Sequence, residues 1–456
     1  MLALVVLAGS PVAQAMGAQQ RLPADTARQS MDTLALDSLR ARLARAEAAI
    51  ALLREQLAGE SESAVRTKSR LHVELSAQVL TNSFLTLGRV NNVDVPQTVL
   101  APPAAGATPA TNDALGFTLR QTRIGVAASV ADVLGGTFGG DVDFDLYGGV
   151  QDGPGDRRLF PELRLRTARA HLVWSRTELM VGSETPLISD LNPMSLAAVG
   201  VPGFSGAGNL WNWLAQVRIT REIAAMGPPQ RSVRWAIQGA VLAPYANTVI
   251  AGEPDGVDAA ERSRRPTIEA RLRARWGDEE ERAITGTEMI GDRGGEIGVG
   301  MHRGWMAIAP GVLGVSHAVS LDAHIVPLRG VELRGEAYAG QLLRGLGGGG
   351  IAQNFGRVQP GAPPGSLGPA VRDVAGWAQL NVQPHPVLVT GIGCGLDLVD
   401  PDANPTRLQN TVCAAHAAWR PMQPLVIGVE YRQLGTRFAT GTFGARHVNL
   451  VLGFEL

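Results

Sequence analysis

Arginines at alternating positions are the residues with the clearest chemical potential in this sequence. The 456-residue chain has one lysine, Lys68, so its positive charge is almost all guanidinium. A guanidinium group stays charged and binds a carboxylate or phosphate through two parallel hydrogen bonds. Arg271, Arg273 and Arg275 share one side of a strand, because strand side chains alternate. Such a row is suited to reversible binding of small anions.

The predicted anion-binding set consists of arginines on the polar side of their strands. Either Arg120 or Arg123 belongs to it, and Arg169 joins only if a β-bulge near Thr167 shifts the alternation. The full set is Arg120, Arg123, Arg164, Arg166, Arg169, Arg218, Arg234, Arg271, Arg273, Arg275 and Arg334. Acidic residues such as Asp143 share that side. The alternative is therefore that individual arginines are structural and neutralised in ion pairs.

Other kinds of chemistry have little support. The formal net charge of −1 gives no indication of nucleic-acid binding, and the scattered histidines show no metal-ligand spacing, so no metal or cofactor is predicted. Gly345–Gly350 matches a dinucleotide-binding fingerprint, but no helix is indicated after it, so we interpret it as a mobile loop. Gly203–Ala207 narrowly misses a nucleophile elbow. An outer-membrane lipase is the least favoured alternative, and the chain is not expected to be an enzyme.

The elements that position the arginines are predicted strands. Apolar and polar residues alternate from Leu71 to the C-terminus, and sixteen strands are predicted between residues 71 and 456. Short connections alternate with long ones, as in an outer-membrane barrel. The last strand, 446–456, keeps one apolar face to its end. Tryptophans are expected in two girdles: Trp174, Trp235, Trp276 and Trp419 at one end of the strands, and Trp211 and Trp213 at the other. The predicted fold is an all-β transmembrane barrel of antiparallel strands.

One long connection has an unusual composition. Pro193–Pro202 is small and apolar throughout, whereas an exposed loop would rarely be so apolar. We therefore expect the loop 186–209 to fold into the barrel as its constriction, with Ser189, Asp190 and Asn192 lining the narrow part.

The two cysteines, Cys394 and Cys413, are predicted to lie on adjacent strands. The midpoint of the connecting loop places them almost opposite each other. Both a cross-strand disulfide and two free buried thiols fit this placement, and the sequence does not separate them.

The N-terminal region has a different pattern from the barrel. Residues 1–15 are typical of a signal peptide that ends at Ala13-Gln14-Ala15. In the predicted helix 31–58, apolar residues from Leu36 to Leu57 recur at alternating spacings of three and four, which favours a coiled coil over a single helix packed on the barrel. Gly59 ends that helix, and 59–70 is a polar linker. The coiled coil is expected in the periplasm.

Several local segments resemble the DcaP-like trimeric outer-membrane porins, relatives of the phosphate-selective porins. They are Leu119–Gly125, Gly335–Gln341, Gly376–Leu380 and Gly428–Arg432. The resemblance implies a homotrimer in outer-membrane lipid and a channel that favours small anionic solutes such as dicarboxylates. Two features depart from the family: the barrel has no lysine, and the final residue is Leu456 rather than an aromatic residue.

The sequence thus predicts a passive diffusion channel in the outer membrane. The alternative from a different class is a structural tether, in which the coiled coil binds peptidoglycan and the pore is plugged.

Overall fold

The computed structural model describes residues 71–103, 113–148, 156–227, 232–249, 256–277, 290, 293–309, 311–363 and 366–456. The predicted signal peptide, coiled coil and linker lie outside these residues. The strands are β1 His72–Leu87, β2 Ala114–Thr118, β3 Arg123–Val133, β4 Gly136–Gly148, β5 Glu162–Val173, β6 Thr177–Glu184, β7 Leu214–Met226, β8 Val233–Leu242, β9 Thr267–Gly277, β10 Gly294–Ala309, β11 Val312–Leu328, β12 Val331–Gln341, β13 Arg372–His385, β14 Leu388–Val399, β15 Arg407–Met422, β16 Leu425–Phe438 and β17 Gly441–Glu455.

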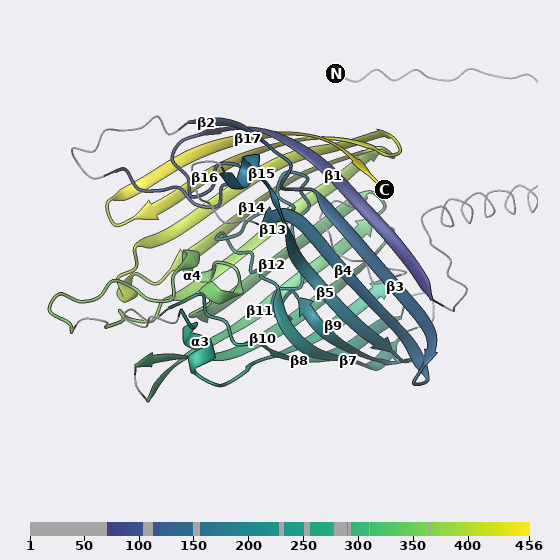
Figure 1. Cartoon of the computed structure of the whole chain (residues 1–456), viewed down its shortest axis with the longest axis horizontal. Helices are drawn as coiled ribbons and strands as arrows, with labels where there is room; N and C mark the ends of the chain where they lie inside the picture. The colour runs from purple at the N-terminus through teal and green to yellow at the C-terminus, as the bar shows by residue number, and fades with distance from the viewer. Residues whose placement is uncertain are drawn as a thin grey trace, which may run out of the picture. The chain divides into compact units, whose positions relative to one another are not determined.

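These strands form one closed antiparallel barrel (Figure 1). From β3 to β17 each strand pairs with the next one along the chain, and β1 closes the ring by pairing with β17 on one side and with β2 and β3 on the other. Because β2 and β3 occupy one position in the wall, the 17 strands make 17 − 1 = 16 positions. The predicted sixteen-stranded barrel is confirmed.

The barrel is apolar outside and polar inside. On β11, Val319 and Leu321 are more than half exposed, whereas Ser320 and Asp322, which alternate with them, are at most 5% exposed. The same contrast holds on β17, where Leu450 and Leu452 face outward. A soluble barrel would place these side chains the other way round, since burying polar groups while exposing apolar ones is unfavourable in water. The arrangement is that of a barrel surrounded by lipid.

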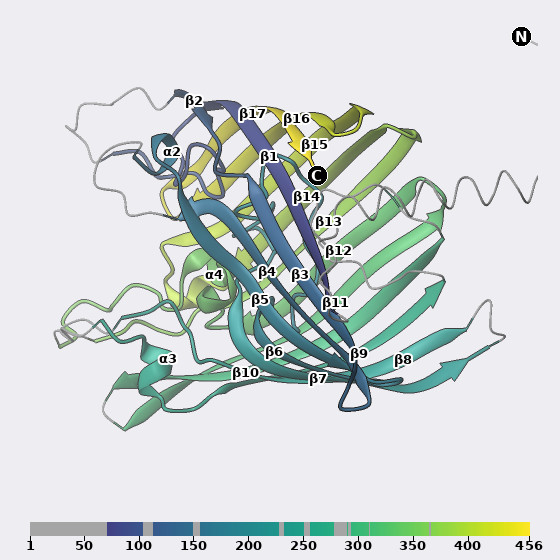
Figure 2. The ribbon, with the colours of Figure 1, turned by 45° about the vertical axis from the view of Figure 1, so that its right-hand side comes forward.

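The connections at the two ends of the barrel differ in length. At one end, turns such as 134–135, 329–330 and 386–387 are short. At the other end, long loops carry the short helices of the described residues: α2 Asp156–Leu159, α3 Ala259–Arg262, η2 Arg344–Leu346, α4 Gly349–Ala352 and η3 Pro401–Ala403. Figure 2 shows α3 and α4 on this loop side. Two connections at the loop end, 310–311 and 439–440, are nevertheless only two residues long. No helix in the described ranges is long and apolar enough to cross a membrane.

The expectation of two aromatic girdles is only half right. Trp419 is 46% exposed on the outer surface near the short turns. Trp211 and Trp213, expected at the opposite girdle, precede β7 and lie in contact with each other, with ring centroids 5.3 Å apart. Arg164 and Arg166, which point into the lumen, lie over the Trp213 ring. The two tryptophans therefore belong to the lumen, because strand β7 begins later than the alternation predicted.

The glycine run Gly345–Gly350 is also different from the expected mobile loop. Gly345, Gly350 and Ile351 are buried at the loop end of the lumen. The amide of Gly350 donates to Asp373 at 2.7 Å, and that of Ile351 donates to Asp397 at 2.9 Å. Positive φ at Gly350 (61°) is a conformation that glycine adopts without strain. The run thus caps buried carboxylates, and the antiparallel strands around it contain no dinucleotide-binding βαβ unit.

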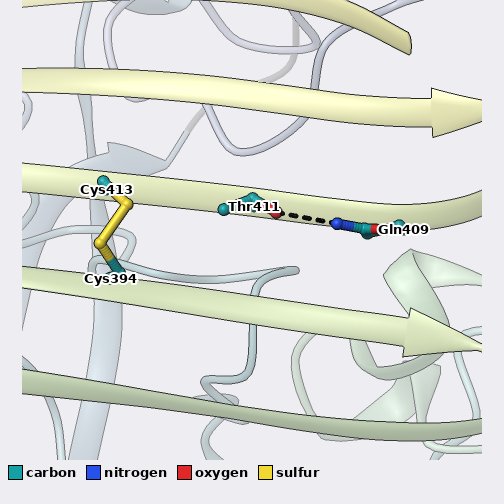
Figure 3. The surroundings of a disulfide bond; sticks show 4 residues. All are labelled: Cys394, Gln409, Thr411 and Cys413. Atoms are coloured by element: carbon teal, nitrogen blue, oxygen red, sulfur yellow. Dashed lines mark hydrogen bonds between the residues drawn. A yellow bond between two sulfur atoms is a disulfide. The ribbon is translucent and has the colours of Figure 1, made fainter.

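Cys394 and Cys413 face each other across β14 and β15, where they form a paired register position. A disulfide with a sulfur–sulfur distance of 2.14 Å joins them (Figure 3). Both side chains share the outward side of the wall with Ile392, which is 61% exposed.

We expect the protein purified without reductant to contain no alkylatable thiol. Mass spectrometry of the unfolded protein after iodoacetamide treatment measures this. Reduction before alkylation is the control and should add two carbamidomethyl groups, one on each cysteine. Labelling of both cysteines without prior reduction would contradict the disulfide.

Candidate functional site

The loop between β6 and β7, residues 185–213, lies inside the barrel. From Thr185 to Leu210 every residue is buried except Asp190 and Asn192, which are partly exposed. Both were expected to line a narrow part of the lumen. Ser189, expected beside them, is instead 0% exposed and donates to Glu336 at 2.8 Å. Asp190 and Asn192 are therefore the loop side chains that reach the remaining lumen space.

Apolar packing holds this loop against the wall on several sides. Leu187 and Ile188 form a cluster with Tyr338 of β12, and Leu196 forms another with Val451 of β17. Phe204 stacks on Trp377 of β13, with ring centroids 5.8 Å apart. The apolar run 193–202 thus forms cores inside a polar lumen, which explains its composition. The loop crosses the barrel interior and does not line only one strand.

Polar side chains of the wall form hydrogen bonds with the backbone of the same loop. Gln379 accepts from the Met194 amide at 2.7 Å and donates to the Met194 carbonyl at 2.9 Å. Gln121 accepts from the amides of Val199 and Gly200 at 2.8 and 2.7 Å. A buried backbone without secondary structure needs such partners, because an unpaired buried amide costs about 1–3 kcal/mol.

Arg271 of β9 joins the loop to the part of the wall formed by β8 to β11. Its side chain is fully buried and donates to Asp322 at 3.1 Å through Nε, and to Gln238 and Asp190 at 2.9 and 3.2 Å through Nη1. Nη2 also donates to Glu296 at 2.8 Å. This arginine is thus a hydrogen-bonded centre that fixes Asp190, and solutes do not reach it.

A bulge in β5 decides the direction of three arginines. Asp143 pairs with Thr167 and Phe144 with Leu165, so Arg166 is an extra residue in the ladder. Arg164 points inward before the bulge, and Arg166, the extra residue, also points inward. Beyond it the alternation is shifted, and Arg169 also points inward, where it pairs with Asp141 at 2.8 Å and with Glu184. The bulge on which the placement of Arg169 depended is present.

The remaining predicted arginines also lie on the inner side of the wall. Arg273 and Arg275 are within 3.7 and 2.7 Å of Glu296. Arg218 lies 3.7 Å from Asp190 and also donates to the Thr185 carbonyl. Arg334 donates to the Asn192 carbonyl at 3.0 Å and pairs with Glu332, and Arg123 pairs with Asp143. Arg234 is half-buried, opposite Arg275 in the β8–β9 register. Most of these guanidinium groups therefore have a carboxylate partner.

Arg120 is buried against the segment that follows β1, of which the structure describes residues 88–103. It donates to Asp94 at 2.9 Å and lies 3.4 Å from the centroid of the Tyr147 ring. Burial raises the pKa of the Asp94 carboxyl above its ordinary value, and the neighbouring Arg120 guanidinium opposes this shift. Both Arg120 and Arg123 are inside the barrel, because the break between β2 and β3 interrupts the alternation that would have separated them.

The predicted set of lumen arginines leaves out Arg432. Arg432 and Glu430 form a buried ion pair on β16, and Ser195 of the loop donates to the same carboxylate. His416 and His447 are buried nearby. Arg432 shares the polar parity of Glu430 and could have been found by the alternation used for the other arginines. The loop contact could not, because it joins residues far apart in sequence.

A further chain of hydrogen bonds links β9, β10 and β11. Glu269 lies 2.8 Å from His302 Nδ1, and His302 Nε2 lies 3.0 Å from the Ser316 hydroxyl. The composition is that of a hydrolase triad, but Ser316 is buried and its hydroxyl also lies 3.1 Å from the Leu342 carbonyl. In this position these hydrogen bonds link the barrel wall to the loop that begins at Leu342. Within the described residues, no cluster of three or more metal-ligating side chains occurs.

Comparisons with known proteins place this barrel among solved outer-membrane channels. The outer membrane channel DcaP of Acinetobacter baumannii is 16% identical, with a TM-score of 0.60, and the match covers 86% of this chain and 100% of that one. OmpF of Salmonella typhi, in complex with daunomycin, is 10% identical over 86% of this chain and 100% of that one, with a TM-score of 0.51. An anion-selective porin from Comamonas acidovorans is 11% identical over 85% and 100%, with a TM-score of 0.50. No family model and no curated protein matches the chain. These likenesses establish a porin-like barrel fold.

Proposed function

We propose that this protein is a passive diffusion channel of the outer membrane that favours small anions such as dicarboxylates. The observation that carries the proposal is the barrel itself, with an apolar outer surface and a charged interior crossed by one loop. In this proposal the barrel performs no covalent chemistry. It lowers the cost of moving a hydrated solute through lipid, and its interior selects by size and charge.

Location and assembly follow from the same features. The outward apolar side chains require outer-membrane lipid as their partner. The signal peptide predicted at residues 1–15 would direct export. The coiled coil predicted at 31–58 would lie in the periplasm and stabilise a homotrimer, whose barrels would also contact one another. The likeness to DcaP supports the channel fold in this proposal.

Anion preference is proposed to come from one sector of the wall. Most lumen arginines are neutralised by a paired carboxylate, so they do not form a ladder of available cationic groups. In one cluster on β3 to β5 and the loop segments beside them, Arg120, Arg123, Arg164 and Arg166 face Asp94, Asp143 and Asp145. The neighbouring Arg169 and Asp141 pair with each other and are not counted in this cluster. The local balance is 4 − 3 = +1, and positive potential in a narrow lumen raises the local concentration of anions.

Single-channel recording in a planar bilayer tests the function. We expect stepwise openings characteristic of a trimer, with a reversal potential across a potassium chloride gradient that shows preference for chloride. Added succinate should compete with the chloride current. A detergent extract prepared in the same way from cells that lack this protein is the control. A folded barrel that carries no current would contradict the channel and favour the tether, in which the loop plugs the pore and the coiled coil binds peptidoglycan.

The lipase alternative now has a specific candidate residue. Ser316 has the hydrogen-bond partners of a nucleophile, in His302 and Glu269, and a small cavity adjoins it. Hydrolysis of phospholipid by the purified protein, abolished in Ser316→Ala, would favour that alternative. We expect no difference between the two proteins, because the hydroxyl is buried in the barrel wall.

A further inference from the structure

A row of polar side chains crosses the outer surface of the barrel at its loop end. Arg303 of β10, His317 of β11, Gln341 of β12 and Arg372 of β13 occupy consecutive paired register positions. Arg303, His317 and Arg372 are exposed on the outward side of their strands. Because neighbouring strands are about 4.8 Å apart, the row is roughly 14 Å wide.

The next row toward the membrane is apolar throughout. Met301, Val319, Ala339 and Val374 are paired in the same way, each two residues from the polar row on its own strand. Val319 and Val374 are 55% and 60% exposed. Outward apolar side chains of this kind contact lipid acyl chains. The boundary between the two rows therefore marks the level of the lipid headgroups on the loop side of the membrane.

Trp305 brings another arginine to this level. Helix α3 packs against Met306 of β10, and Arg265 lies in the segment that joins α3 to β9. Arg265 Cζ lies 5.6 Å from the centroid of the Trp305 ring, and Arg303 Cζ lies 5.7 Å from it. The ring attracts each cation, but two guanidinium groups beside one ring repel each other. An anion in contact with both would offset that repulsion.

The acidic residues of these strands do not reach the outer surface. Those of β9 to β13 all lie on the lumen side: Glu269, Glu296, Asp322, Glu332, Glu336 and Asp373. The exposed Glu261 of α3 accepts from the Asp258 amide at 3.0 Å as a helix cap. Among the described residues, none supplies a carboxylate to Arg265, Arg303 or Arg372. These three residues, the outer arginine row, therefore carry three uncompensated positive charges.

We propose that the outer arginine row binds the phosphate groups of a phosphorylated glycolipid in the outer leaflet of the membrane. A phosphate monoester carries about −1.5 to −2 charges at neutral pH and accepts parallel hydrogen bonds from guanidinium groups. A glycolipid with a phosphate at each end of its sugar headgroup contacts the Arg265–Arg303 pair and Arg372 together. Its acyl chains then lie along the apolar row. This interaction is separate from conduction, because the row lies outside the lumen.

Native mass spectrometry of the full chain in detergent measures this binding, with diphosphoryl lipid A as the probe. We expect saturable binding to the wild type. Affinity should be at least about tenfold weaker in the double variant Arg265→Gln, Arg303→Gln, because charge-assisted hydrogen bonds are lost. Arg221→Gln is the matched control, since Arg221 is also exposed on the outer surface but lies near a short turn and donates to Thr177. It should bind as the wild type does.

Three further probes identify the chemistry of the ligand. Lipid A from which both phosphates have been removed keeps its acyl chains and should bind at least about tenfold more weakly. Phosphatidylglycerol has a single phosphodiester, which cannot contact both ends of the row, so it should also bind more weakly than diphosphoryl lipid A. Inorganic phosphate in excess should not displace the lipid, because it lacks the apolar contacts.

A second variant separates the position of the arginines from their charge. Trp305→Leu keeps both guanidinium groups and an apolar side chain but removes the aromatic ring that holds them. Its affinity for diphosphoryl lipid A should lie between those of the wild type and the double variant. It also carries the test if the double variant does not fold.

The outcomes distinguish this site from other lipid contacts. Equal affinity of diphosphoryl lipid A for the wild type, the double variant and Trp305→Leu would overturn the site, as would equal binding of the lipid without phosphates. Equal binding of phosphatidylglycerol would overturn the assignment to a glycolipid with two phosphates. Displacement by inorganic phosphate would assign the arginines to a free anion and overturn lipid binding. The single-channel conductance of the double variant tests the channel function separately and should equal that of the wild type.

Discussion

Replacement of residues 189–208 by a short Gly-Ser linker is expected to raise the single-channel conductance severalfold. This segment lies inside the barrel, and only Asp190 and Asn192 of it are partly exposed. Its apolar side chains pack against several strands, so they exclude water from the space through which ions would move. Conductance increases with the water-filled cross-section of a pore, and removal of the segment opens that cross-section.

The barrel should tolerate the change. Glu336, Glu430 and Arg271 lose partners in the loop, but water enters the enlarged lumen and hydrates them. The desolvation penalty for an unpaired buried charge therefore does not apply in full. Ladder pairing of all strands is retained, since the deletion starts and ends outside β6 and β7.

Deletion of 358–363 is the matched control for the loop replacement. These residues belong to the exposed part of another long loop, and all but Ala362 are exposed. Their removal should leave the conductance unchanged. If the replacement of 189–208 gave a folded barrel with wild-type conductance, the current would not pass through the space that this loop occupies.

Arg271→Gln is expected to destabilise the barrel by about 3–5 kcal/mol, as when one partner of a buried ion pair is removed. The side chain is 0% exposed, and it donates to Asp322, Glu296 and Asp190 together. Asp322, at 1% exposure, would be left as a buried carboxylate without its cation. The measurement is urea unfolding in detergent micelles, followed by tryptophan fluorescence.

The double variant Arg271→Gln, Asp322→Asn shows whether the loss comes from the unpaired carboxylate. Its stability should exceed that of the single arginine variant, because a neutral amide replaces the stranded charge. Arg273→Gln is the comparison on the same strand. Arg273 is partly exposed, 3.7 Å from Glu296, so a much smaller loss is expected. Equal losses for Arg271→Gln and Arg273→Gln would show that Arg271 is not the anchor.

This distinction changes how the arginines of β9 are understood. The alternation of Arg271, Arg273 and Arg275 correctly indicates that all three share the inner side of the wall. It gives no information on which of them a solute could reach. Arg271 is enclosed by the loop and by carboxylates from β10 and β11, whereas Arg273 and Arg275 retain some exposure. Replacing all three arginines by neutral residues would therefore change the stability of the barrel and its selectivity at the same time.

The sequence alone was enough to predict the strands of the barrel wall and the direction of their side chains. Period-two alternation records which side of a strand meets lipid, so it predicted both the last strand, 446–456, and the shared direction of Arg271, Arg273 and Arg275. It also placed Cys394 opposite Cys413, because register across a short loop follows from counting residues. The apolar composition of 193–202 indicated a buried loop for the same reason, since apolar side chains are removed from water wherever they lie.

Only the tertiary structure decided what lies inside the wall. The contacts of Asp190 with Arg271 and of Ser195 with Glu430 join a loop to distant strands, and no local pattern encodes such pairs. The side of the barrel reached by Trp213 depended on where β7 begins, and the direction of Arg166 depended on one inserted residue in β5. Local alternation fixes the direction of a side chain, but pairing and exposure arise from packing between segments that are far apart in the chain.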